Sequence, residues 1–425
     1  MPTILRQTWP LLLGIALLTL GHGLQGTLLG VRANLAAFST ATTGVVMSGY
    51  YVGLLLGSLR APRLVARVGH VRVFAALLSL ASAAVLFHAV LVQPAAWFLM
   101  RLVTGYCFAG AFIVAESWLN GAASNANRGR LLSLYMVVHM CGLGLGQFLL
   151  NLADPVGFDL FVLVSVLISV AAVPMLLTAT ATPPLTQPRN MGLGALYRLS
   201  PLGVVGIVGV GAAQSGLYAM GPVYATDQQL SLAAVSTFMA AIVLGGIIFQ
   251  IPIGRLSDRF DRRWMIAAIA LLTAVAALPF ALRTEATPAM LFAGYFVVGG
   301  LSLPLYALCV AHTNDFLSPE QMVGASSALI LGYGLGAAVG PTLTAVFMQV
   351  MGPTGFALFL ALAHAAIATF ALYRMTRRPS IPAEERGPFR PLPNPSPVVT
   401  PLAQESARGG GGSAAAPLDE LVDAG

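Results

Sequence analysis

The chain of 425 residues consists largely of long apolar runs that are separated by short polar segments. A helix needs about 20 apolar residues to cross the hydrocarbon core of a bilayer. The runs do not alternate between polar and apolar residues, which excludes a membrane β-barrel. Because a backbone in lipid must satisfy its own hydrogen bonds, each run is predicted to be a membrane-spanning helix. Twelve runs qualify: 8–31, 42–60, 73–92, 96–119, 131–152, 157–178, 201–223, 232–253, 264–282, 287–310, 322–349 and 354–374.

The composition excludes most other classes of protein. Hydrophobic residues make up 57% of the chain and charged residues only 9%, whereas a soluble domain carries about 25% charged residues. So few charges cannot cover a water-facing surface, which argues against a soluble enzyme, a disordered protein or a nucleic-acid-binding protein. The three cysteines lie inside apolar runs without metal-ligand spacing and are interpreted as buried apolar residues. No metal and no cofactor are expected.

The basic residues predict the orientation of the chain. All 22 are arginines, and they cluster between the apolar runs. If the N-terminus is cytoplasmic, 19 of the 22 fall on the cytoplasmic side or in the tail, as the positive-inside rule requires. We therefore expect both termini in the cytoplasm.

The two halves of the sequence repeat each other. A shift of 192 residues superposes Arg63 and Arg67, after the second apolar run, on Arg255 and Arg259, after the eighth. Two parallel repeats of six helices are one known plan of secondary transporters. The last 50 residues hold nine prolines and the run 409–412 of four glycines, a composition typical of disorder. The predicted organisation is a six-helix bundle at 1–178, a cytoplasmic loop at 179–200, a second six-helix bundle at 201–375 and a disordered cytoplasmic tail at 376–425.

Three motifs resemble those of the major facilitator superfamily. Residues 254–263, Gly-Arg-Leu-Ser-Asp-Arg-Phe-Asp-Arg-Arg, are similar to its loop signature, with Asp261 where that pattern usually has glycine. Residues 57–72 resemble the first-half copy, with Ala66 in place of the aspartate. The segment 101–105, Arg-Leu-Val-Thr-Gly, resembles the arginine motif of the family.

A narrower resemblance is to the YcaD-like branch of that superfamily. Residues 61–70, 116–120 and 257–263 carry it, and the likeness as a whole extends over about residues 8–375. The resemblance implies a twelve-helix transporter in a bacterial inner membrane, but it implies no substrate. It also implies that helices 1, 4, 7 and 10 line a central cavity.

Polar groups inside the apolar runs indicate where a solute could bind. A charge at the bilayer centre costs about 2.5–3.5 kcal/mol, so these groups should face the bundle interior. They lie on the same four helices that the resemblance implies, on one face of each. Arginine would hold an anion by charge-assisted hydrogen bonds, and tyrosine rings would form flat walls. We predict a small organic solute, anionic or aromatic, bound by His22, Gln25, Arg101, Gln214, Tyr218, Tyr295 and Tyr306.

Motifs that the sequence lacks limit the possible energy sources of transport. No phosphate-binding loop is present, so the chain is not expected to hydrolyse ATP. Proton coupling, sodium coupling and facilitated diffusion stay open, and protons are favoured because embedded carboxylates are nearly absent. The predicted proton carriers are Glu116, His22 and His139. A structural ion pair with Arg67 or Arg128 is the alternative role of Glu116.

A cytoplasmic gate is predicted from the distribution of loop charges. On that side, the charged residues of the first-half loops are all arginines, whereas the second-half loops also carry acidic residues. Ion pairs between the halves could bias a two-state equilibrium of a few kcal/mol; alternatively, the arginines only set the topology. The predicted gate residues are Arg63, Arg67, Arg128, Arg130, Asp258, Arg259, Asp315 and Glu320.

We therefore predict a monomeric, proton-coupled secondary transporter with alternating access, and not an enzyme. One alternative is a proton-antiporting exporter of drugs or metabolites. Gly340-Pro341 weighs mildly against it, because that antiporter-like pair lies in helix 11 and not in helix 5. The alternative of another class is a sensor or assembly factor that has kept the fold without transporting.

Overall fold

A computed structural model describes residues 2–122, 128–177, 191–283, 286–377, 387 and 389, and the side chains of these residues except at 2–7, 120–122, 128–130, 319–320 and 323. Within these ranges all regular structure is helical. Twelve segments of the described chain are long and apolar enough to span a membrane. The predicted all-α membrane fold is confirmed.

The first bundle contains the six predicted helices, of which the fifth changes its winding. Its outer part is a 3₁₀ helix, η1, that continues directly from α5. The elements are α1 (Pro2–Leu35), α2 (Thr40–Val68), α3 (His70–Val90), α4 (Pro94–Ala122), α5 (Arg128–Gly146), η1 (Gln147–Leu152) and α6 (Asp159–Leu176).

The second bundle also contains six spans, of which the fourth, helix 10 of the chain, is interrupted between α11 and α12. A short helix, α7, lies inside the segment that was predicted to be a loop. The elements are α7 (Leu193–Leu199), α8 (Pro201–Asp227), α9 (Leu232–Arg259), α10 (Arg262–Leu282), α11 (Pro288–Ser302), α12 (Leu305–Asn314), α13 (Pro319–Met351) and α14 (Thr354–Met375).

The predicted disordered tail lies outside the described residues, apart from 376, 377, 387 and 389. Phe389 is only 8% exposed, and its N–H donates to Asp258 Oδ1 at 2.7 Å. The carbonyl of Gly387 accepts a hydrogen bond from Arg262. These two residues of the tail are therefore held against α9 and α10.

The repeat predicted from the sequence extends to the helix starts. Ser39 caps α2 by accepting from the N–H of Thr42 at 3.2 Å, and Ser231, 192 residues later, caps α9 by accepting from Ala234 at 3.3 Å. The next helix of each repeat, α3 or α10, begins in a different way. Gly69 precedes α3 with φ +96°, whereas Asp261 precedes α10 with φ −62° and caps it through its carboxylate.

Close helix contacts repeat as well. A Cβ at Gly53 would lie 2.0 Å from the carbonyl oxygen of Leu102, and one at Gly245 would lie 2.0 Å from that of Phe296. Helices α2 and α4 therefore pack as tightly as α9 and α11, because only glycine admits this approach. The same contacts fix the depth of residues on α4 relative to α2.

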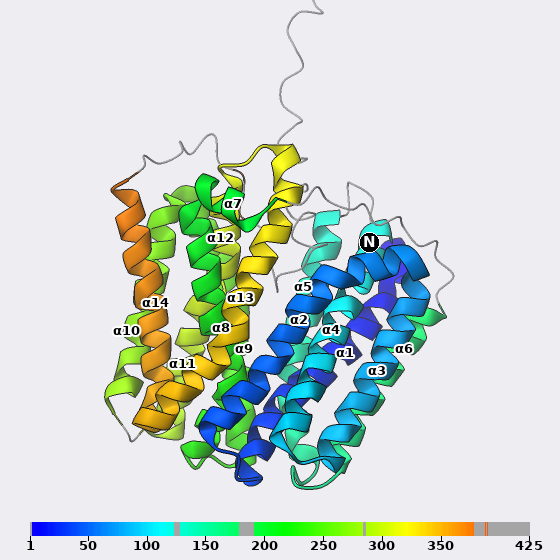
Figure 1. Ribbon diagram of the computed structural model, residues 1–425. Coiled ribbons are helices and arrows are strands. Elements are labelled where there is room, and N and C mark those ends of the chain that lie inside the picture. Colours follow the sequence, from blue (N-terminus) through cyan, green and yellow to red (C-terminus); the bar gives the residue numbers. More distant parts are fainter. Residues whose placement is uncertain are drawn as a thin grey trace, which may run out of the picture.

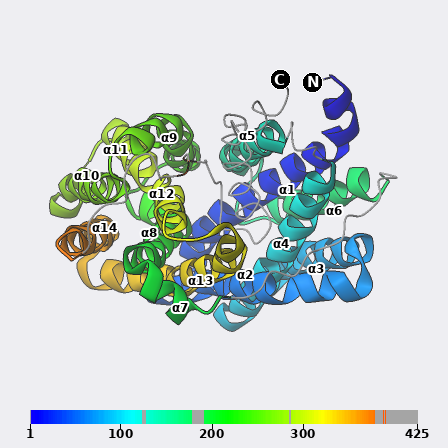
Figure 2. The ribbon, with the colours of Figure 1, turned by 90° about the horizontal axis from the view of Figure 1, so that it is seen from above.

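The two bundles lie side by side, with α1 and α2 of the first against α8 and α13 of the second (Figures 1 and 2). We name the two ends of the molecule. The arginine-rich end is where α1 begins, α14 ends and Arg67 and Arg259 lie; the far end is opposite, where α1 ends and α2 begins.

Among the residues whose side chains are described, the hydrogen bonds between the bundles all lie towards the far end. There the seam is closed by Asn34 Nδ2 to Asp227 Oδ1 at 2.9 Å, Ser48 Oγ with Thr342 Oγ1 at 2.8 Å, Asn151 Nδ2 to Ser236 Oγ at 3.1 Å, and the N–H of Ala41 to Gln349 Oε1 at 3.4 Å.

Candidate solute-binding cavity

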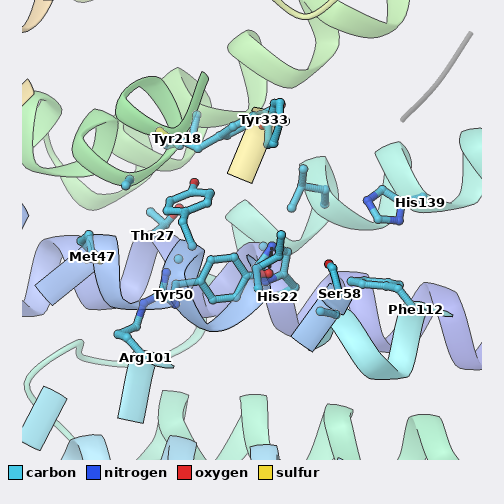
Figure 3. Close-up of a pocket in the computed structure, with 18 of the residues that line it drawn as sticks. His22, Thr27, Met47, Tyr50, Ser58, Arg101, Phe112, His139, Tyr218 and Tyr333 are labelled. Atoms are coloured by element: carbon cyan, nitrogen blue, oxygen red, sulfur yellow. Dashed lines mark hydrogen bonds between the residues drawn. The ribbon is translucent and has the colours of Figure 1, made fainter. Parts of the chain in front are cut away.

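A cavity with a volume of about 120 Å³ lies between the bundles, enough for several water molecules or a small solute. It is lined by α1, α2, α4, α5 and η1 of the first bundle and by α8, α9 and α13 of the second. Figure 3 shows Tyr218 and Tyr333 facing His22, Tyr50 and Arg101 across it.

Arg101 brings a buried positive charge to this cavity. It lies two turns into α4, is 3% exposed, and its guanidinium carbon is 4.4 Å from the centre of the Tyr50 ring. Its Nε and Nη1 have no hydrogen-bond partner within the described part of the chain, and no carboxylate there forms an ion pair with it. A desolvated charge without a counter-ion is costly, so this site is suited to an anion.

Aromatic rings surround the arginine. The His22 ring stacks on Tyr50 with centroids 5.2 Å apart and lies 5.0 Å from Phe108. His22 Nε2 is 3.4 Å from the Tyr50 hydroxyl, whereas Nδ1 has no partner among the described residues. The ring stack therefore leaves one imidazole nitrogen available to a ligand.

A carboxylate lies at the other end of the cavity. Glu116 is 15 residues beyond Arg101 on α4, or about 22 Å along the helix axis. It is 3% exposed and accepts a hydrogen bond of 2.5 Å from the hydroxyl of Tyr135. The Tyr135 ring lies 5.8 Å from that of His139. The cavity is therefore polarised, with the cation deep inside and the acid near the arginine-rich end.

Five of the residues predicted for binding or proton coupling meet at this cavity, and four do not. His22, Arg101, Glu116, His139 and Tyr218 line it. The other four, which lie outside its lining, are Gln25, Gln214, Tyr295 and Tyr306.

The residues outside the lining are buried in other surroundings. Tyr295 is surrounded by the rings of four aromatic residues of other helices, at centroid distances of 4.9 to 5.6 Å. Tyr306 lies behind Tyr333, 5.4 Å from its ring. Gln214 donates to the carbonyl of Ser302. Gln25 is 1% exposed, and within the described residues its amide has no partner.

Helix 10, which the resemblance implied as a lining helix, contributes no residue to this cavity within the described ranges. Tyr295 of α11 is the equivalent of Arg101 of α4, because each directly precedes the residue, Phe296 or Leu102, whose carbonyl packs on the equivalent glycine of the neighbouring helix. Aromatic side chains surround Tyr295, whereas Arg101 lines the cavity.

Several lining residues were missed by the sequence analysis. Tyr50, Tyr51, Tyr135 and Tyr333 line the cavity, but they belong to helices 2, 5 and 11, where tyrosines were not considered. A usable signal was the pair Tyr50-Tyr51, which places two hydroxyl groups in the middle of an apolar run.

Among the described side chains, no ion pair of a predicted gate residue joins the two bundles. Arg63, Arg67 and Arg259 are exposed, and the side chains of Arg128, Arg130 and Glu320 lie outside the described set. The described ion pairs all lie within the second bundle, where Arg262 contacts both Asp315 and, at 3.5 Å, Asp258. Arg262 was not predicted, although it belongs to the same loop motif.

No metal site was found in the described ranges, since no three His, Cys, Asp or Glu side chains come together there. Comparison with known proteins gives the family. A sequence profile of the Major Facilitator Superfamily matches residues 11–249 and 205–409. The chain belongs to this superfamily. It is therefore a multi-pass membrane protein of a transporter family and not an enzyme.

Curated relatives carry the same branch name that the motifs indicated. The chain is 29% identical to the uncharacterized MFS-type transporter YcaD of Escherichia fergusonii over 346 residues, which cover 81% of this chain and 89% of the relative. It is also 29% identical to YcaD of Salmonella typhimurium over 351 residues, covering 82% and 91%. The resemblance to the YcaD-like branch is confirmed.

Solved structures share the fold at low identity. The nucleoside transporter NupG superposes with a TM-score of 0.70 and 15% identity, covering 88% of this chain and 99% of NupG. A bacterial homolog of the human lysosomal transporter Spinster superposes with a TM-score of 0.65 and 15% identity, covering 95% and 97%.

Proposed function

We propose that this protein is a secondary active transporter that moves a small organic anion across a bacterial inner membrane by alternating access, with proton coupling. The observation that carries the proposal is the buried guanidinium of Arg101, which faces the cavity without a protein counter-ion among the described residues. An anionic solute would supply the missing hydrogen-bond acceptors and the missing charge.

The remaining walls favour a solute with a flat apolar part. Tyr51 of the first bundle and Tyr218 and Tyr333 of the second line the same cavity, and such rings offer an apolar face with a polar tip. A solute held between them would contact both bundles. Its binding energy could therefore favour one arrangement of the bundles over another.

The proposed proton site is Glu116 with Tyr135. A carboxylate that is buried beside the same cavity changes its charge when it takes a proton, and an electrostatic change of this kind favours one state of the transporter over the other. Two solved proteins of similar fold are named for related activities. They are a fucose:proton symporter (TM-score 0.54, 15% identity) and a human organic anion transporter (TM-score 0.62, 15% identity).

The proposed orientation has the arginine-rich end in the cytoplasm, and the positive-inside rule supports it. Because the hydrogen bonds between the bundles that involve described residues lie at the far end, the cavity is proposed to face the cytoplasm in this state. The predicted gate pairs would then form only after the bundles rock to close the cytoplasmic side.

The proposal is tested by binding before transport. Purified protein is heated with aromatic and aliphatic monocarboxylates and, in parallel, with the neutral amides of the same acids. Carboxylates that bind should raise the melting temperature, and their amides should not. Arg101→Gln should weaken the binding about 10- to 100-fold, the effect of losing a hydrogen bond to a charged group.

Arg32→Gln is the matched control, because Arg32 is an arginine of α1 that does not line the cavity. Uptake of the best carboxylate into proteoliposomes should fall with Arg101→Gln and persist with Arg32→Gln. Equal stabilisation by acids and amides, or full uptake by Arg101→Gln, would refute an anion site at Arg101.

A further inference from the structure

Helix 10 is interrupted inside the second bundle, whereas its counterpart in the first bundle is continuous. Helix α11 ends at Ser302 and α12 begins at Leu305, but α4 runs without a break from Pro94 to Ala122. Pro304 lies in the gap. It has no N–H to bond to the carbonyl four residues earlier, and its ring collides with that carbonyl. We call residues 302–305 the helix 10 break.

Carbonyls at the end of a helix lack intrahelical partners, and those of the break find one in Gln214 of α8. Gln214 Nε2 donates to the carbonyl of Ser302 at 2.9 Å and to that of Leu303 at 3.3 Å. Gln214 is 5% exposed. Its amide therefore supplies two N–H groups to the carbonyls at the end of α11.

The other end of the same amide reaches the cavity wall. Gln214 Oε1 accepts a hydrogen bond of 3.3 Å from the hydroxyl of Tyr333, and Tyr333 lines the cavity. The Tyr333 ring also contacts that of Tyr306, the second residue of α12, at 5.4 Å. One cavity residue thus touches the group that caps α11 and a side chain of α12.

The inner half of helix 10 leads directly to the arginine-rich end. Asp315 follows α12 and pairs with Arg262 at the start of α10. A change of angle at the break would therefore move the acid that was predicted to serve the cytoplasmic gate.

We propose that Gln214 is a positioning residue that holds the helix 10 break, and that its bond to Tyr333 couples the wall of the solute cavity to this break. The inference rests on the proposed function only where it gives this coupling a role in transport, because a transporter must link its cavity to its gate. The coupling itself is a property of the empty protein and is tested without a solute.

The first experiment is a double-mutant cycle on the full chain with Gln214→Met and Pro304→Ala, read by hydrogen exchange of residues 303–308. Gln214→Met removes both bonds to the break and should accelerate exchange there at least about fivefold, because the loss of even one neutral hydrogen bond has about that effect. Pro304→Ala restores the missing N–H and removes the ring collision, so a continuous helix can form in which the carbonyls of Ser302 and Leu303 accept from the N–H groups four residues later. In that background Gln214→Met should change exchange by less than about twofold.

The second experiment removes one hydroxyl from the cavity wall. Tyr333→Phe keeps the ring and its contact with Tyr306 but deletes the bond to Gln214, and it should accelerate exchange at the break about threefold or more. Tyr218→Phe is the matched control. It removes a hydroxyl from the same cavity, and Tyr218 makes no described hydrogen bond to Gln214.

Two results would overturn the inference. One is an equal effect of Gln214→Met with and without Pro304; the other is an equal effect of Tyr333→Phe and Tyr218→Phe at the break. Neither depends on Arg101 or on any solute. Failure of the carboxylate experiments would remove the proposed anion transport, whereas these exchange results would still decide whether the cavity wall and helix 10 are coupled.

Discussion

Arg101 and Tyr295 occupy equivalent positions in the two repeats, but of the two only Arg101 lines the cavity described above. The sequence alone can predict that both point into their bundles, because the helical period and the cost of polar groups in lipid decide that. It could not predict what fills the space beside them. The rings around Tyr295 come from four other helices, α8, α9, α10 and α14, and no pattern within helix 10 reveals them.

At the same scale, Glu116 is expected to carry the coupling proton. Glu116→Gln keeps an oxygen that can accept from Tyr135 but removes the titratable charge. Proteoliposomes with this variant should still equilibrate the solute. They should no longer accumulate it against its concentration gradient when an inwardly directed proton gradient is imposed. Tyr106→Phe, on α4 but outside the cavity lining, should accumulate solute normally. Undiminished accumulation by Glu116→Gln would assign the proton to another residue.

At the scale of elements, apolar runs predicted the number of spans and most of their limits, since length and hydropathy alone determine which segments cross a bilayer. They did not predict the interruptions. Helix 10 is an uninterrupted apolar run around Pro304, and whether a proline breaks a helix depends on partners for the freed carbonyls. The partner here, Gln214, comes from a helix about 90 residues earlier in the chain.

The tight contact between α2 and α4 gives a stability prediction. A Cβ at Gly105 would lie 1.9 Å from the backbone oxygen of Tyr50, so Gly105→Ala must push the two helices apart. We expect a loss of about 1–3 kcal/mol, the usual cost of overpacking, measured as a lower melting temperature. Because Tyr50 would move away from Arg101, carboxylate binding should weaken too. Gly194→Ala, in a helix position with open space around it, should not destabilise the protein.

At the scale of the whole molecule, the two bundles contribute different groups to the cavity, although they are repeats of one another. The described cavity takes its ionisable groups, His22, Arg101, Glu116 and His139, from the first bundle, apart from tyrosines. The second bundle contributes Tyr218, Tyr333 and the interrupted helix. This arrangement favours a mechanism in which the first bundle binds charge and the second responds by moving, so that the seam at the far end must open in the other half of the cycle.

Locking this seam should stop the cycle. Ser48 and Thr342 lie on α2 and α13 with their oxygens 2.8 Å apart, so Ser48→Cys with Thr342→Cys, in a background without the three native cysteines, should form a disulfide between the bundles. Oxidised protein should lose uptake, because its far end cannot open, and reduction should restore it. Carboxylates should still raise its melting temperature, since the cavity stays open to the other side.

A disulfide within one bundle separates this effect from mere oxidation. Ser82 and Ser165, on α3 and α6 of the first bundle, have hydroxyl oxygens 2.6 Å apart, and the corresponding cysteine pair joins helices that move together if the bundles rock as rigid bodies. Uptake by this variant should survive oxidation. If both disulfides stop transport, the first bundle must deform during the cycle; if neither does, the solute does not pass through the seam between Ser48 and Thr342, and alternating access by separation of the far ends is wrong.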